Sequence, residues 1–254
     1  MINIEIYYFG MGLEMNSFIR KSVRPFYDFL AALGSTGLWF TVPMKGKNRL
    51  RFYSRKKCID RNYDRNVAAF KRHEERIERE KGFIENQNLY SDMHYGICSM
   101  DRNGCGVIAV YNALRALGIN EAGSEGIPSL PNLISIFENS GITMAGQLGT
   151  GPRSIADFFD KRGIGIRTAT DENRYSAIVR MCPVCIITIF NNRDRLHDYV
   201  HTMCITKEGD FLVLHNSNGG RKIYSSMKEL MLGCGIKGKA KGMMIVGIDR
   251  MRMC

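Results

Sequence analysis

The chain has 254 residues, of which 44% are hydrophobic and 24% are charged, and its formal net charge is +11. This length suits one good core with an appendage or two small domains, and the composition excludes a disordered or fibrous chain. The positive charge favours anionic partners. Because no signature of an RNA- or DNA-binding fold accompanies the charge, we expect no specific nucleic-acid binding.

Membrane and secretory signals are not apparent in the sequence. The start, MINIEIYYFGMG, lacks the basic region and the small-residue cleavage site of a signal peptide. The uncharged run 29–44 is interrupted by glycines and is shorter than the roughly 20 apolar residues that a membrane span needs. We therefore expect no membrane span and a cytoplasmic location. In that reducing compartment most of the eight cysteines are expected to be buried apolar thiols rather than disulfides.

The first 92 residues read as an accessory region. The patterns predict a helix over 16–33, a hairpin over 37–54 and a strongly charged helix over 60–88. Residues 45–57 are rich in lysine and arginine and contain no acidic residue, so they are a candidate surface for an anionic partner, although a solvated basic face also explains them. From about residue 93 the charge falls and the apolar runs lengthen. We place a domain boundary there and expect a second domain over 93–254.

The Cys182-Pro-Val-Cys185 spacing is typical of a redox pair or of half a zinc site. No second pair with suitable spacing is present, and the β-branched run that follows predicts a buried strand rather than a helix. We therefore interpret Cys185 as a core residue and predict no metal and no cofactor.

A buried helix is predicted over 105–118, with the sequence CGVIAVYNALRALG. Apolar residues recur at helical spacing, Gly118 closes the helix, and Asn103 before Gly104 is a candidate cap. Cys105 then lies in the first turn, where unpaired N–H groups and the helix dipole lower the pKa of a thiol. This position suits a nucleophile, and it equally suits a small apolar residue that packs the helix start.

A cysteine nucleophile needs a base, and the base needs a residue that orients it. The segments 201–206 and 211–216 both read as strands. If Glu208 and Gly209 form a two-residue turn, His201 lies directly opposite Asn216, close enough for a side-chain hydrogen bond. A Cys105–His201–Asn216 triad is therefore predicted, with the sulfur and a ring nitrogen about 3–5 Å apart. Two unrelated polar residues at a sheet edge are the alternative.

These motifs resemble a known family. The segment SMDRNGCGVIAVYNALRALG is similar to the motif that opens the bacteriocin-leader-processing (double-glycine) cysteine peptidases and their papain-like relatives. GPRSIADFFDKRGIGIRTA, CPVCIITIF and HTMCITKEGDFLVLHNSN are similar to its later helix–Gly–strand, strand and His–strand–turn–strand units. The resemblance covers about residues 95–250. It implies a papain-like fold and peptidase activity.

The chain departs from the family at the oxyanion hole. The family usually carries Gln six residues before the nucleophile, and this chain has Ser99 there. Loss of one oxyanion donor typically costs about 10²–10³ in rate. Ser99 and Asn103 are the candidate donors in its place.

The expected fold is α+β: a papain-like domain with a central helix packed on an antiparallel sheet, preceded by a mainly helical region with a hairpin. The expected function is a cysteine hydrolase that acts on a peptide or isopeptide bond of a peptide or protein substrate. The alternative is a catalytically weak or inactive domain of the same fold that binds a peptide or protein partner.

Overall fold

The computed structural model describes residues 56–96, 98–119, 129–140, 149–192, 200–217, 220–236 and 238–251. The helices are α3 (Lys56–Arg79), α4 (Met100–Asn103), α5 (Cys105–Leu117), α6 (Leu130–Ser140), α7 (Pro152–Asp160), α8 (Tyr175–Met181) and α9 (Met227–Gly233), with 3-10 turns η1 (Gln87–Leu89) and η3 (Glu172–Arg174). The strands are β1 (His94–Tyr95), β2 (Cys98–Ser99), β3 (Ile164–Ala169), β4 (Val184–Phe190), β5 (Val200–Glu208), β6 (Phe211–Ser217), β7 (Gly220–Tyr224) and β8 (Lys241–Met251).

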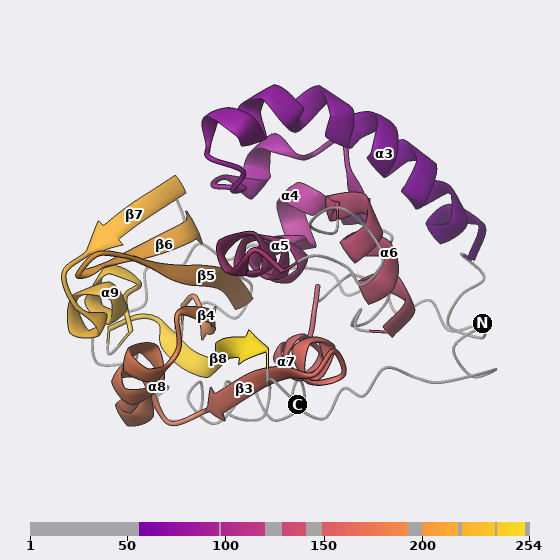
Figure 1. Ribbon diagram of the computed structural model, residues 1–254. Helices are drawn as coiled ribbons and strands as arrows, with labels where there is room; N and C mark the ends of the chain where they lie inside the picture. The colour runs from indigo at the N-terminus through magenta and orange to yellow at the C-terminus, as the bar shows by residue number, and fades with distance from the viewer. Residues whose placement is uncertain are drawn as a thin grey trace, which may run out of the picture.

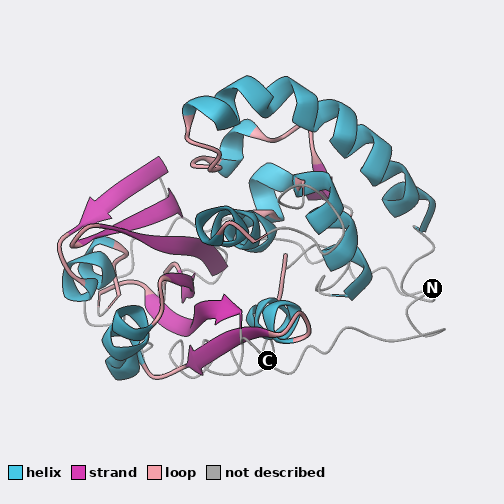
Figure 2. Cartoon of the chain, viewed as in Figure 1, coloured by secondary structure: helices cyan, strands magenta, loops and turns pink. Residues whose placement is uncertain are grey.

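A six-stranded sheet forms the centre of the molecule. Its order is β3-β8-β4-β5-β6-β7, and every neighbouring pair is antiparallel. Helices α3, α5, α6 and α7 contribute to the hydrophobic core on one side, and α8 and α9 to the core on the other (Figure 1, Figure 2). Because apolar side chains from both faces of the central strands need cover, β4, β5 and β6 are mostly buried, whereas the edge strand β7 is not. The predicted α+β fold with a central helix on an antiparallel sheet is confirmed.

The central helix is α5, which lies across β5 and neighbouring strands. Its residues from Cys105 to Leu114 are all buried. Gly118 ends the helix with φ +62°, and its N–H donates to the carbonyls of Leu114 and Arg115. A residue with a Cβ is disfavoured in that left-handed conformation, so the predicted stop at Gly118 is confirmed.

The charged helix α3 ends earlier than we predicted. We expected it to reach residue 88, whereas it stops at Arg79. Lys81 and Gly82 adopt φ values of +57° and +86°, and the Gly82 N–H donates to the Ile77 carbonyl at 2.7 Å. This pattern terminates an α-helix, and it turns the following residues back toward α5 and the sheet.

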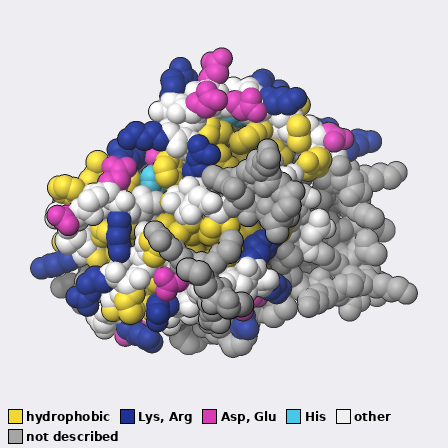
Figure 3. All heavy atoms as spheres, in the orientation of Figure 1, with side chains coloured by type: hydrophobic (Ala, Val, Ile, Leu, Met, Phe, Trp, Pro, Cys, Tyr) yellow, Lys and Arg dark blue, Asp and Glu magenta, His cyan; other side chains and the backbone are white. Residues whose placement is uncertain are grey.

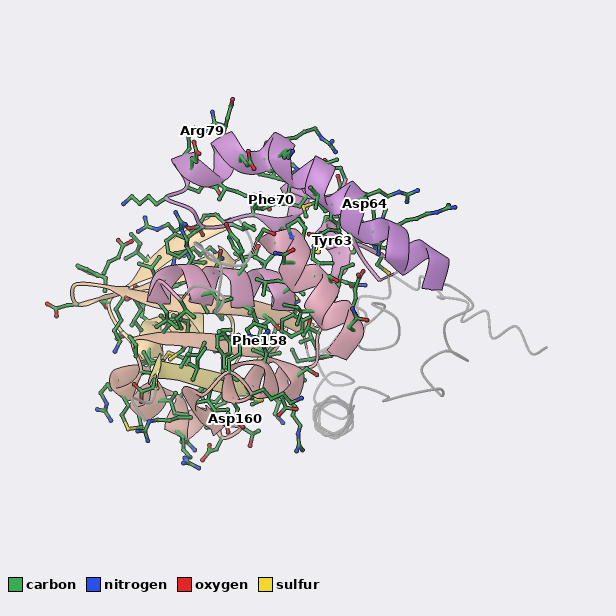
Figure 4. The ribbon with its side chains drawn as sticks, turned by 45° about the vertical axis from the view of Figure 1, so that its right-hand side comes forward. Tyr63, Asp64, Phe70, Arg79, Phe158 and Asp160 are labelled. Atoms are coloured by element: carbon green, nitrogen blue, oxygen red, sulfur yellow. The ribbon has the colours of Figure 1, made fainter. Side chains whose placement is uncertain are left out.

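Helix α3 shares its core with the rest of the domain. Ala69 and Ile77 belong to the same buried cluster as α5, α6 and α7. The Phe70 ring on α3 meets the Tyr111 ring of α5 edge-on, with 6.4 Å between the ring centroids. Phe158 on α7 stacks on Phe137 of α6, with 5.1 Å between the ring centroids (Figure 4 labels Phe70 and Phe158). Among the described residues, α3 therefore shares one core with α5, α6 and α7, and the domain boundary expected near residue 92 stays a prediction. The predicted helix 16–33 and hairpin 37–54 lie outside the described residues.

Charges of both signs are mixed on the face shown in Figure 3, where Lys and Arg side chains alternate with Asp and Glu. Most of the basic segment 45–57 lies outside the described residues, so its anionic partner stays a prediction. Among the helices that the structure describes, none has the length and apolar character to cross a membrane.

Candidate active site

Cys105 is the first residue of α5, and Gly104 before it is the N-cap residue. No side chain caps this end of the helix. Gly104 has no side chain with which to cap the first N–H groups of α5, and the positive end of the helix dipole lies at Cys105. Both effects favour a thiolate. The predicted cap is wrong, because Asn103 is the last residue of α4 instead.

Two glycines flank Cys105 for steric reasons. A Cβ atom on Gly104 would lie 2.6 Å from the carbonyl oxygen of Met100, and one on Gly106 would lie 2.7 Å from Cβ of Thr150. Both separations are shorter than real Cβ atoms tolerate. The Gly-Cys-Gly sequence thus lets the start of α5 approach the neighbouring backbone and side chains closely.

His201, the second residue of β5, lies beside the Cys105 thiol, close enough for the two side chains to shift each other's pKa. Its Nε2 atom lies 2.7 Å from the backbone carbonyl oxygen of Asn216. A carbonyl can only accept, so Nε2 carries the proton of the neutral ring and Nδ1 is the nitrogen left for the sulfur. The structure therefore brings Cys105 and His201 together and determines the tautomer of the ring.

Thr202 supports the sulfur from the same strand. Its backbone and its hydroxyl lie near enough to the Cys105 sulfur that hydrogen bonding from both lowers the pKa of the thiol. The Thr202 hydroxyl also lies 3.2 Å from that of Thr188 on β4, so it can donate to sulfur while it accepts from Thr188. Both threonine side chains are buried.

The pKa values of the two groups shift in opposite directions. Burial raises the pKa of Cys105, but the hydrogen bond and charge of His201 and the two bonds from Thr202 lower it, and the net pKa lies below that of an ordinary thiol. Burial lowers the pKa of His201, whereas the hydrogen bond and charge of Cys105 and the Asn216 carbonyl raise it, and the net pKa lies above that of ordinary imidazole. This arrangement favours transfer of the thiol proton to the ring, which gives a thiolate–imidazolium pair.

Asn216 contacts His201 differently from our prediction. We expected its side chain to bind the ring, but its backbone carbonyl does so. The Asn216 side chain instead binds Gln87: its Oδ1 accepts from the Gln87 backbone N–H at 2.9 Å, and its Nδ2 donates to the Gln87 Oε1 at 3.0 Å. Asn216 adopts φ +57°, and the β6–β7 ladder is irregular at this point.

The strand register explains the difference. Glu208 pairs with Phe211, and Cys204 pairs with His215. The turn between the two strands therefore consists of Gly209 and Asp210. The predicted turn at 208–209 is therefore wrong, and the register differs from the prediction by two residues. Because the shift is even, each side chain keeps its face of the sheet. Directly opposite pairing of His201 with Asn216 is excluded, yet the two residues stay close enough for the carbonyl contact.

Ser99 and Asn103, the candidate oxyanion donors, lie on the segment that leads into α5. Ser99 ends β2 and is the N-cap residue of α4, without a side-chain cap hydrogen bond. Both residues are partly buried. Their roles as donors stay a prediction.

Sequence reasoning missed Thr202 and Gln87. Alternation along a strand predicts that Thr202 points away from its neighbour His201, and no motif marks it. Gln87 falls in the segment that we predicted to be helical, so nothing suggested a contact with Asn216. Among the residues that the structure describes, no group of three or more His, Cys, Asp or Glu side chains could hold a metal ion.

Comparisons with known proteins give one structural likeness to report. No protein-family model matches the chain, and no curated protein matches it significantly. A solved structure of similar shape is the peptidase domain of Streptococcus ComA, a bi-functional ABC transporter involved in a quorum-sensing pathway, with 11% identity and a TM-score of 0.37. The match covers 57% of this chain and 90% of that one.

Proposed function

We propose that this chain is a cysteine hydrolase that cleaves a peptide or isopeptide bond. In this proposal Cys105 is the nucleophile, His201 the general base and Asn216 the residue that orients the base. The observation that carries the proposal is the position of the His201 ring, which lies beside Cys105 at the start of α5 and has its Nε2 atom 2.7 Å from the Asn216 carbonyl oxygen. A thiol, a base and an orienter in this order are the parts that acyl transfer requires.

The reaction proceeds through an acyl-enzyme. The Cys105 thiolate attacks the substrate carbonyl carbon, and the His201 imidazolium gives its proton to the departing amine as the C–N bond breaks. A water molecule then attacks the thioester while neutral His201 accepts its proton. The C–S bond breaks, the acid product leaves, and the proton returns to the Cys105–His201 pair.

The developing oxyanion needs hydrogen-bond donors. The backbone N–H of Cys105 lies at the helix start, where N–H groups lack intrahelical acceptors. Ser99 and Asn103 are the proposed side-chain donors beside it. With serine in place of the family's glutamine, we expect a slow or specialised enzyme.

A covalent-capture experiment tests the proposal. An activated ester and an aminoacyl-coumarin amide are supplied to wild type, Cys105→Ala, His201→Ala and the control Cys234→Ala, whose thiol lies elsewhere and whose pKa burial raises to about 11. We expect product release and an acyl adduct on Cys105 by peptide mapping in wild type and Cys234→Ala, and neither in the two site variants. Equal progress curves for wild type and Cys105→Ala would contradict the proposal.

A second candidate is a catalytically weak or inactive domain that binds a peptide or protein partner. The low solvent exposure of the two site residues favours this second candidate, because only 9% of the Cys105 surface and 8% of the His201 surface are accessible to solvent. In that case Cys105 is alkylated by a small reagent, but no acyl-enzyme accumulates on any activated substrate. The capture experiment separates the two candidates.

A further inference from the structure

The residues directly after α3 form a strap, Phe83–Asn88, that lies against α5 and β6. Its backbone at Ile84 exchanges two hydrogen bonds of 2.9 Å with the Asn112 side chain of α5. Further along, the Gln87 backbone and side chain bind Asn216. The strap thus reaches the residue that holds His201.

A buried hydrogen bond between Glu85 and His215 anchors the strap between these two points. The Glu85 Oε1 lies 2.8 Å from Nδ1 of His215, and Nε2 of His215 lies 2.8 Å from the Thr206 hydroxyl. The Phe83 ring stacks on His215 at 4.2 Å. Glu85 and His215 are both buried, so loss of one partner would leave the other without its bond in a site away from water. The strap is therefore part of the domain that holds the site.

The orientations of the two amides at the end of the strap determine each other. The Gln87 backbone N–H can only donate, so the Asn216 atom that faces it is Oδ1. The Asn216 Nδ2 then donates, so the Gln87 atom that faces it is Oε1. This leaves the Gln87 Nε2 to donate to the Asp101 carbonyl at 2.7 Å, which is the arrangement observed. A flip of either amide would break two of these three bonds.

These bonds close a ring around the site. Cys105 binds His201, whose Nε2 binds the Asn216 carbonyl. Gln87 holds the Asn216 amide and also binds Asp101 on α4, which leads directly into Cys105. Asn216 has a left-handed φ and is 1% exposed, so its carbonyl direction depends on what holds the residue in that conformation.

From this ring we infer that Gln87 is a positioning residue that acts through Asn216 to hold His201 against Cys105. The inference rests on the proposed function of the Cys105–His201 pair. It gives a segment outside the predicted peptidase domain a role in the reaction, because the base depends on the strap for its orientation.

The test compares Gln87→Met with the matched control Asn88→Ala. Methionine keeps the length of glutamine but removes its side-chain hydrogen bonds, while Asn88 is an exposed neighbour in the same turn. The readouts are the pH profile of Cys105 alkylation by iodoacetamide, the titration of the His201 ring by NMR, and thermal unfolding. We expect Gln87→Met to slow alkylation near pH 6.5 by about 10-fold to 10²-fold, the scale that misplacement by about 1 Å produces. We also expect the His201 pKa to fall, and Asn88→Ala to match wild type.

Gln87→Glu keeps an acceptor for Asn216 but cannot donate to Asp101, so it should fall between wild type and Gln87→Met. If Gln87→Met does not fold, Gln87→Glu carries the same comparison with wild type. The inference is overturned if the folded Gln87→Met variant shows the alkylation profile and the His201 titration of wild type. In that outcome His201→Ala would still slow alkylation, and the proposed function would stand. If His201→Ala itself leaves alkylation unchanged, the proposed function fails and the inference fails with it.

Discussion

Nε2 of His201 lies 2.7 Å from the backbone carbonyl oxygen of Asn216, and the Asn216 side chain points its polar atoms at Gln87 instead. The acceptor that orients the ring is therefore part of the main chain, and it is present whatever residue occupies position 216. What the residue type controls is the left-handed backbone conformation, which asparagine adopts more readily than most residues, and the amide bonds to the strap.

Substitution of Asn216 by Gly should therefore have a moderate effect. Glycine tolerates the left-handed conformation and keeps the carbonyl, but it removes the amide that Gln87 holds. We expect alkylation of Cys105 at pH 6.5 to slow by at most about 10²-fold. The double variant Asn216→Gly/Gln87→Met should be alkylated no more slowly than either single variant. Replacement of an orienting carboxylate by an amide, which gives the wrong tautomer, costs about 10⁴ in kcat. A loss of that size would mean that the Asn216 side chain, and not its carbonyl, orients His201.

The pH dependence of Cys105 alkylation should depend on His201. The hydrogen bond and charge of His201 lower the Cys105 pKa against the effect of burial, so the rate in wild type should rise at a pH below the value of about 8.5 that is typical of a free thiol. In His201→Ala these causes are lost while much of the burial stays. The alkylation rate of Cys105 should therefore begin to rise only at a higher pH, and the rate near pH 6.5 should fall. Iodoacetamide labelling with peptide mapping measures each cysteine separately, and Cys234 serves as the internal reference.

Ser99→Gln should increase turnover if the site is a working hydrolase. The longer side chain supplies the amide donor that the resembled family uses, and one oxyanion donor is worth about 10²–10³ in rate. The measurement is a progress curve on the activated ester, with Cys105→Ala and the double variant Ser99→Gln/Cys105→Ala as background controls. If wild type, Ser99→Gln and Cys105→Ala give the same curve, the peptide-binding candidate takes precedence over the enzyme.

Glu85→Ala should destabilise the domain strongly. The substitution leaves His215 buried without its partner on Nδ1, and a buried polar group that loses its hydrogen-bond partner typically costs about 1–3 kcal/mol. The control is Glu78→Ala on the exposed side of α3, where a surface substitution should stay within about 0.5 kcal/mol. Urea unfolding of the three proteins gives the comparison. Equal midpoints for Glu85→Ala and Glu78→Ala would show that the Glu85–His215 hydrogen bond does not anchor the strap.

Local patterns predicted several elements correctly. Apolar residues at helical spacing and a terminal glycine predicted α5 and its end at Gly118, because both signals act within one or two turns of the chain. The β-branched run after Cys182 predicted that Cys185 is a buried strand residue, and it lies in β4 with 1% of its surface exposed. The same kind of local reasoning placed Cys105 at a helix start.

The tertiary structure decided how these elements meet. The amino-acid sequence by itself determined which residues form the central helix and strands, since propensity and periodicity are properties of short segments. It did not determine the turn at Gly209, the early end of α3 or the contacts of Asn216, because near-equivalent local choices exist for each. Gln87 and Asn216 are 129 residues apart, and their hydrogen bonds exist only because α3 packs on the shared core and turns the strap back toward β6. Contacts of that range depend on the packing of the whole domain, which no local pattern encodes.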